Sequence, residues 1–182
     1  MATFSVPTRD EVSENNQAIF DNLQKGLGFV PNLYATYAYS DTALSDYLAL
    51  QNRRSSLKAK EREVINLVVS QVNECDYCLA AHTALGKMNG FTEEQILEIR
   101  SGEASFDAKF DALAKFVKDI TVNRSKPSVE VTDNLLAAGY TKENLVDIIV
   151  VIGDKIISNF IHGATQIPVD FPAAPALEVA TA

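Results

Sequence analysis

Two cysteines and a histidine lie close together near the middle of the chain, at Cys75, Cys78 and His82. Each residue of a helix advances by ~100°, so Cys78 lies about 60° round from Cys75, and His82 about 40° round from Cys78. The three side chains would therefore share one narrow face of a helix. Two thiols with a histidine one turn away predict redox chemistry in which the imidazole accepts a thiol proton.

The predicted chemistry is attack of a thiolate on a peroxide oxygen. Cys75 would stand at the start of the helix, where free backbone N–H groups and the helix dipole favour a thiolate. The attacked peroxide leaves a sulfenic acid on sulfur, which the second thiol converts to a disulfide. An external thiol reductant must then reopen the disulfide by thiol–disulfide exchange. A pair three residues apart has little use as a structural crosslink inside a cell.

A zinc half-site is the alternative interpretation of the same three residues. Structural zinc takes four protein ligands, and the other histidine, His162, has no cysteine near it in the sequence. A carboxylate or water would have to complete the site. We predict no metal and no bound cofactor, and we expect His162 to be structural. Tyr77, between the cysteines, is expected to pack, although its hydroxyl could reach the site.

A carboxylate that relays the proton could come from the helix before the cysteines, which offers Glu61, Glu63 and Glu74. Glu63, Leu67, Ser70 and Glu74 fall on one stripe at the margin of the apolar face. Partial desolvation there would raise the pKa of a carboxyl group and suit it to proton transfer. Spacing alone does not choose among the three glutamates.

The composition predicts an acidic globular protein. The 182 residues are 47% hydrophobic and carry a formal net charge of −8. Because no basic cluster interrupts this acidity, we expect neither nucleic acid nor an anionic membrane surface as a partner. The N-terminal residues lack the basic start and apolar run of a secretory signal, and no apolar stretch is long enough to cross a bilayer. We therefore expect a cytoplasmic protein.

Helix signals dominate the chain, and no convincing alternating strand pattern occurs. A Thr8–Glu11 capping box predicts a first helix that Gly26 and Gly28 stop, and shorter helices are expected to start near Pro31, Ser40 and Thr92. Longer helices are expected at about 59–72, 75–89, 107–123, 129–138 and 142–163. After Gln166, three prolines predict an extended tail with a disordered end.

Two ten-residue segments, 90–99 and 139–148, resemble each other at an offset of 49 residues. Both read Gly, aromatic, Thr, one variable residue and Glu, followed by matching apolar positions. The pattern predicts a duplicated helical unit, with chance similarity at a common helix junction as the alternative. The offset moves the two cysteines and the histidine onto Arg124, Pro127 and Val131, so only the first copy would carry the chemistry.

The candidate residues resemble the alkylhydroperoxidase AhpD / carboxymuconolactone decarboxylase family. Its peroxidase-type members carry Glu-x11-Cys-x-x-Cys-x-x-x-His, a pattern that this chain matches at Glu63, Cys75, Cys78 and His82. Further matching positions are Arg62, Val64, Ser70, Asn73 and residues 77–82, with weaker similarity at 28–33 and 167–172.

This resemblance implies an all-α, AhpD-like multihelical bundle with a duplicated helical core, and a homo-oligomer such as a trimer or hexamer. It also implies a peroxidase that reduces hydrogen or alkyl hydroperoxides with electrons from a dithiol or redox protein. Glu63, His82 and a water would relay the proton, with Tyr77 and Ser70 in support. We expect Cys78, nearest His82, to attack and Cys75 to resolve, although the helix-start argument favours the opposite order.

We expect one AhpD-like domain over residues 1–182. Its expected parts are N-terminal helices at 1–55, the Cys-x-x-Cys unit at 56–102, a second helical unit at 103–166 and an extended, proline-containing tail at 167–182.

Two other functions remain open. The family's other branch decarboxylates a lactone acid without a cofactor, and an anionic lactone would need arginines in its pocket. Four arginines are available but form no clear site in the sequence: Arg53, Arg54, Arg62 and Arg100. The third possibility is a thiol redox sensor or zinc-stabilised interaction module with no turnover.

Overall fold

The computed structural model describes residues 4–177, and within that range every regular element is a helix. The all-α class is therefore confirmed. None of the helices in this range is long and apolar enough to span a membrane. In chain order they are η1 (Arg9–Glu11), α1 (Glu14–Leu27), α2 (Asn32–Tyr37), α3 (Ala43–Gln51), α4 (Ala59–Val72), α5 (Asp76–Met88), α6 (Glu93–Ser101), α7 (Ala108–Val122), α8 (Val129–Ala137) and α9 (Lys142–Thr165).

The first long helix begins later than the sequence suggested. The Thr8–Glu11 capping box does form, with the Thr8 N–H donating to Glu11 Oε2 at 2.8 Å, but it closes only the short η1. Val12 is extended, and Ser13 then becomes the N-cap of α1. The extended residues Val12 and Ser13 thus separate η1 from α1, although the Ser13 side chain makes no capping hydrogen bond. α1 ends at Gly28, whose φ of 85° lies in the left-handed region.

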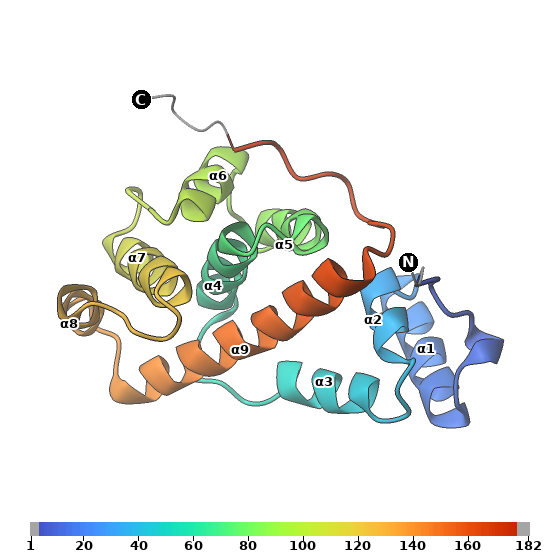
Figure 1. Ribbon diagram of the computed structural model, residues 1–182. Coiled ribbons are helices and arrows are strands. Elements are labelled where there is room, and N and C mark those ends of the chain that lie inside the picture. The colour runs from blue at the N-terminus through green and yellow to red at the C-terminus, as the bar shows by residue number, and fades with distance from the viewer. Residues whose placement is uncertain (1–3, 178–182) are drawn as a thin grey trace. The chain divides into compact units, whose positions relative to one another are not determined.

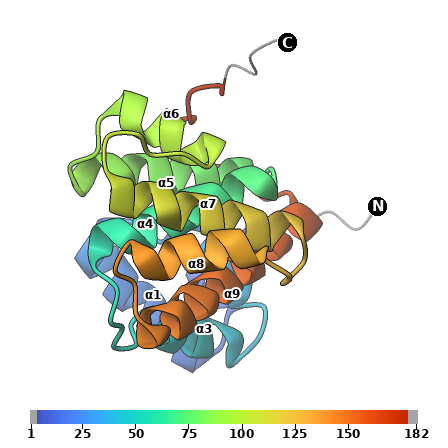
Figure 2. The same cartoon turned by 90° about the vertical axis from the view of Figure 1, so that its left-hand side faces the viewer.

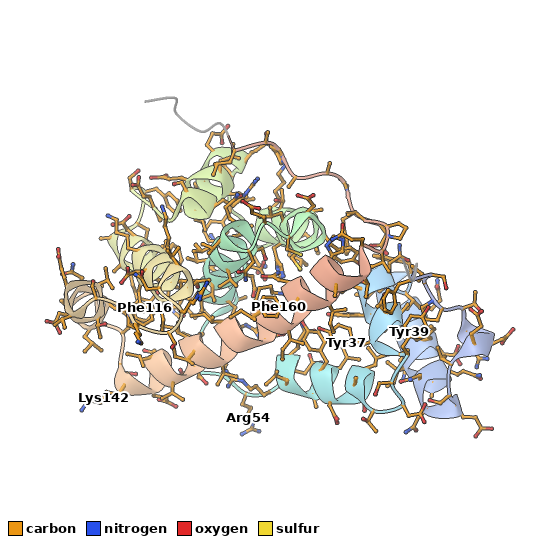
Figure 3. The ribbon with its side chains drawn as sticks, in the orientation of Figure 1. Tyr37, Tyr39, Arg54, Phe116, Lys142 and Phe160 are labelled. Carbon is orange, nitrogen blue, oxygen red and sulfur yellow. The ribbon has the colours of Figure 1, made fainter. Side chains whose placement is uncertain are left out.

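The described residues group into two compact units, and the prediction of a single domain stays a prediction. One unit holds residues 4–54 and 160–170, and the other holds 55–159 and 171–177. In the first, the rings of Tyr37 and Tyr47 stack at 4.3 Å between centroids, which joins α2 to α3; Tyr37 is labelled in Figure 3. The candidate site lies wholly in the second unit.

Helix α4 is the centre of the second unit. Figure 1 shows α5 on one side of it and α7 on the other, and both helices contact it. The apolar face of α4 is almost completely buried against these neighbours, and Phe116 of α7, labelled in Figure 3, belongs to the same core. α4 therefore also holds polar side chains inside the bundle, among them Glu63, Asn66 and Ser70.

The helical core is duplicated. α4 and α7 begin 49 residues apart, at Ala59 and Ala108, and α6 and α9 begin at the same offset. The junctions repeat as well, because Gly90 and Gly139 have φ values of 84° and 94°. After each glycine a threonine caps the next helix through a reciprocal side-chain and backbone pair, with Gln95 at Thr92 and Asn144 at Thr141.

The two copies differ in two places. α5 and α8 end at the same offset, but α8 starts only at Val129 and lacks the first turn of α5. Figure 2 shows α8 alongside α7. α6 stops at Ser101, whereas α9 continues to Thr165, so residues beyond about 150 have no counterpart in the first copy.

The described part of the tail contains no helix or strand, and its predicted disordered end lies outside the described residues. In Figure 1 the last described residues of the tail lie beside α6 of the same unit. Buried Arg100 of α6 holds them there, because Nη1 donates to the Pro175 carbonyl at 2.7 Å and Nε donates to Gln71 Oε1 at 2.9 Å. This arginine is therefore already engaged in packing the tail.

Candidate active site

A tight turn between α4 and α5 positions the two cysteines. Glu74 has a φ of 52°, in the left-handed region that non-glycine residues rarely adopt. The next residue, Cys75, is the N-cap of α5, and its N–H donates to the Ser70 carbonyl at 3.0 Å. Cys78 then lies in the first turn of the helix. The predicted placement of the pair at a helix start is what the structure has.

Both cysteines are free and almost fully buried, with exposures of 3% for Cys75 and 2% for Cys78. The pKa of the Cys78 thiol is lowered to about 7, chiefly by a hydrogen bond from Cys75. Burial opposes this shift, and the charge of Lys155 and a hydrogen bond from Asn159 support it. The carboxylate of Asp154 acts in the opposite direction. The surroundings of Cys78 therefore favour its thiolate form.

Glu63 of α4 and His82 of α5 form a buried pair, with 2.8 Å between Glu63 Oε2 and His82 Nδ1. A carboxylate can only accept, so the imidazole Nδ1 carries the hydrogen. His82 Nε2 is then left with its lone pair. Because helical side chains lean towards the N-terminus, His82 leans towards the turn that holds Cys78.

Near pH 7, the Glu63 carboxyl group is ionised and the His82 imidazole is neutral. Burial and the nearby positive charge of Lys155 lower the pKa of His82 and outweigh the attraction of Glu63. Burial alone would raise the pKa of Glu63, but attraction to a protonated His82, the hydrogen bond from His82, the Lys155 charge and a hydrogen bond from Asn66 together lower it. The imidazole is thus held as a neutral base by an ionised carboxylate.

The structure separates Glu63 from the other two candidate carboxylates. Glu61 accepts the Lys58 N–H at 2.7 Å and pairs with Lys109 Nζ at 3.1 Å, which are structural contacts at the start of α4. Glu74 is exposed in the turn. Only Glu63 contacts His82, a choice that the spacing of the sequence left open.

The extension of α9 supplies side chains that the sequence analysis missed. Asn159 accepts from Asn73 Nδ2 at 2.9 Å and donates to Ser70 Oγ at 3.5 Å, which places it against the end of α4. Lys155, one turn earlier, is only 3% exposed. The available signal was a set of polar residues at helical spacing in an otherwise apolar segment, namely Asp154, Lys155, Ser158 and Asn159.

The remaining predicted residues occupy varied positions. Ser70 is fully buried and contacts Asn159. Tyr77 is 2% exposed and meets the ring of Phe171 edge-on, with 5.7 Å between centroids. His162 lies in the other unit, 3.2 Å from the Ile167 carbonyl. Within residues 4–177, no three His, Cys, Asp or Glu side chains are placed to hold a metal ion together, so the zinc interpretation gains no support.

Parts of the chain are similar to known proteins. The carboxymuconolactone decarboxylase family matches residues 38–119. An uncharacterised Bacillus subtilis protein, YdfG, is 28% identical over 102 residues, which are 55% of this chain and 69% of that protein.

Two solved structures share the fold over nearly all of the chain. An uncharacterised peroxidase-related protein from Silicibacter sp. TM1040 is 25% identical with a TM-score of 0.77, covering 92% of this chain and 89% of its own. A second, from Ralstonia eutropha JMP134, is described as an alkylhydroperoxidase AhpD core; it is 20% identical with a TM-score of 0.82, covering 92% and 91%. These similarities connect residues 38–119 to the carboxymuconolactone decarboxylase family and show that the chain shares its fold with AhpD-like, peroxidase-related structures.

Proposed function

We propose that the protein is a thiol-dependent peroxidase that cycles the Cys75–Cys78 pair between dithiol and disulfide. The observation that carries the proposal is the buried Glu63–His82 pair at 2.8 Å, one helical turn from Cys78. It leaves a neutral imidazole nitrogen one helical turn from a thiol whose pKa is lowered to about 7. A nucleophile, a base and a group that orients the base are thus all present.

The first step transfers two electrons from sulfur to the peroxide. When Cys78 is a thiol, His82 Nε2 accepts its proton and Glu63 stabilises the imidazolium. The sulfur attacks the peroxide oxygen, so a sulfur–oxygen bond forms, the oxygen–oxygen bond breaks, and the departing alkoxide or hydroxide takes the proton from His82. The products are a sulfenic acid on Cys78 and an alcohol or water.

The second step closes the disulfide and returns the site to its starting chemistry. The Cys75 sulfur attacks the Cys78 sulfenic sulfur, and water leaves with the Cys75 proton. A dithiol or a redox protein then reduces the disulfide and supplies two electrons and two protons. Buried Ser70 and Tyr77 support the walls of the site. We further propose a cytoplasmic homo-oligomer, with no metal or bound cofactor.

Peroxide-dependent consumption of a reduced dithiol by the metal-free protein tests this function. We expect turnover in the wild type, none in Cys75→Ser or Cys78→Ser, and a weakened rate in His82→Ala. Pro127→Ala is the matched control, because Pro127 stands at the position of Cys78 in the second copy, and it should keep the wild-type rate. Absence of turnover in the wild type, with both thiols reduced or with stoichiometric zinc bound, would contradict the proposal.

A further inference from the structure

One face of α9 is polar although it is buried. Lys155, Ser158 and Asn159 follow each other at i, i+3 and i+4, and their exposures are only 1–3%. Apolar residues normally fill such a face, because a buried polar group without a partner costs free energy. Asn159 is accounted for by its hydrogen bonds to Asn73 and Ser70. Lys155 requires a separate explanation.

The Lys155 ammonium makes no hydrogen bond to any residue that the structure describes, and no ion pair within 4.0 Å there. Removing an ammonium from water costs several kcal/mol, so a buried lysine needs a compensating anion. Its charge acts on three groups, Glu63, Cys78 and His82. Glu63 is already engaged by His82 Nδ1. The carboxylate of Asp154 is nearby, but in the described part of the chain its Oδ1 is buried without a hydrogen-bond partner and it forms no ion pair with Lys155 within 4.0 Å. Cys78 is therefore the remaining group on which the Lys155 charge acts that can supply a negative charge.

We propose that the Lys155 ammonium, and not a His82 imidazolium, is the counter-ion of the Cys78 thiolate in the resting protein. The inference takes Cys78 as the attacking sulfur and so rests on the proposed function. Lys155 is a positioning residue: it holds the sulfur ionised before peroxide arrives, and it keeps His82 neutral.

The surrounding charges fit this division of roles. The titratable and charged groups that act on Cys78 are Cys75, the cap of the same helix, and Asp154 and Lys155 from α9. Glu63 and His82 form the neighbouring pair on which the Lys155 charge also acts. Lys155 is the only one of these groups that is positively charged when His82 is neutral. A positive charge stabilises a nearby thiolate and destabilises a nearby imidazolium, so one lysine has both effects.

When Cys78 is already ionised, the inference changes the first step of the proposed peroxidase reaction. The Cys78 proton has already left to solvent, so the thiolate attacks directly. The sulfur–oxygen bond forms as the oxygen–oxygen bond breaks, and water protonates the departing alkoxide, with hydroxide as the second product. His82 Nε2 then keeps its lone pair and can accept the proton of Cys75 when the disulfide closes.

Thiolate titration in the full-length Cys75→Ser background tests the inference without any peroxide, because serine keeps a hydrogen-bond donor beside Cys78. The readouts are thiolate ultraviolet absorbance and the rate of alkylation by iodoacetamide as functions of pH. Lys155→Met should raise the titration midpoint by about one pH unit or more. It should also slow alkylation near neutral pH by about fivefold. Lys155→Arg should restore most of the shift, and exposed Lys115→Met should change nothing.

The decisive comparison is with His82→Gln in the same background. We expect its midpoint to move less than that of Lys155→Met, whereas a larger shift in His82→Gln would overturn the inference. Nuclear magnetic resonance of the His82 ring gives a second test that needs no lysine variant. The ring should stay neutral while Cys78 ionises, and an imidazolium that appears together with the thiolate would contradict the proposal. A protein that passes both tests but lacks turnover would refute the proposed peroxidase alone.

Discussion

The two copies of the helical unit share their framework and differ in their chemistry. α4 and α7 start 49 residues apart, as do α6 and α9, and Leu67 of α4 and Phe116 of α7 are equivalent buried apolar residues. At the position of Glu63, however, the second copy has Ala112. The shared positions make the bundle, since they are the ones that bury apolar surface. Polar residues that only the first copy has, such as Glu63, mark the candidate site.

The structural differences coincide with the site. The first turn of α5, which carries Cys78, has no helical counterpart, because a turn containing Pro127 precedes α8. The extension of α9, which carries Lys155 and Asn159, has no counterpart in α6. The site is therefore built from the one added turn of the first copy and the added length of the second. Duplication supplies the scaffold, and departures from the repeat supply the reactive groups.

The largest effect should come from removing the carboxylate that distinguishes α4 from α7. Glu63→Gln should lower the peroxidase rate by about a hundredfold, because His82 loses the negative charge that orients it and stabilises its protonated form. Glu61→Gln, two residues away, should keep the rate and instead lower the free energy of unfolding by about 1 kcal/mol. Steady-state kinetics and chemical denaturation of both variants measure this. Equal rate losses would mean that the site does not distinguish the two buried carboxylates.

Lowering the pH should reduce the free energy of unfolding through His82. The equivalent residue in the second copy is a valine. The pKa of His82 is lowered in the folded protein, so the unfolded chain takes up a proton that the folded chain refuses. This contribution to stability is full above the unfolded pKa of about 6.5. As the pH falls below that value, the free energy of unfolding should drop by up to about 1.4 kcal/mol per pH unit.

Denaturation curves between about pH 7 and pH 5 should show a smaller slope for His82→Gln than for the wild type. Val131→Ala, at the equivalent position of the second copy, is the control and should keep the wild-type slope. Identical slopes in all three proteins would exclude a buried, neutral His82.

The smallest predicted effect is a loss of stability at the glycine junctions, and it should be equal in the two copies. Gly90→Ala and Gly139→Ala each place a side chain on a left-handed backbone, which costs about 1–2 kcal/mol. Neither added Cβ would come within 3.4 Å of a neighbour, so the cost should be backbone strain alone. Thermal or chemical denaturation should therefore give similar losses. A clear inequality would show that the two junctions are not mechanically equivalent.

Local signals allowed most of the fold to be predicted from the sequence. The Gly90 stop, the Thr92 cap and the helical spacing at 59–72 each act within a few residues, and the structure confirms them. The Thr8 box was also real, but sequence alone could not tell that the chain would become extended at Val12 and that α1 would begin only after Ser13.

The site was predictable only where its parts share one helix. Cys75, Cys78 and His82 follow from spacing along α5, whereas Glu63 could be chosen over its neighbours only through the family pattern. Lys155 and Asn159 come from a helix about 80 residues further along the chain, and only tertiary structure shows that their face is buried. A lysine in a sequence is ordinarily solvated, so its burial is the information that folding adds.

Reaction of the fully reduced protein with one equivalent of peroxide tests the central claim most directly, followed by thiol counting and mass spectrometry. The account predicts loss of both thiols in the wild type with a Cys75–Cys78 disulfide as the product. In Cys75→Ser it predicts a sulfenic acid on Cys78 that dimedone traps. Unreacted thiols in the wild type would contradict a peroxidase, and a trapped sulfenic acid on Cys75 in Cys78→Ser, with none on Cys78 in Cys75→Ser, would contradict Cys78 as the attacking sulfur.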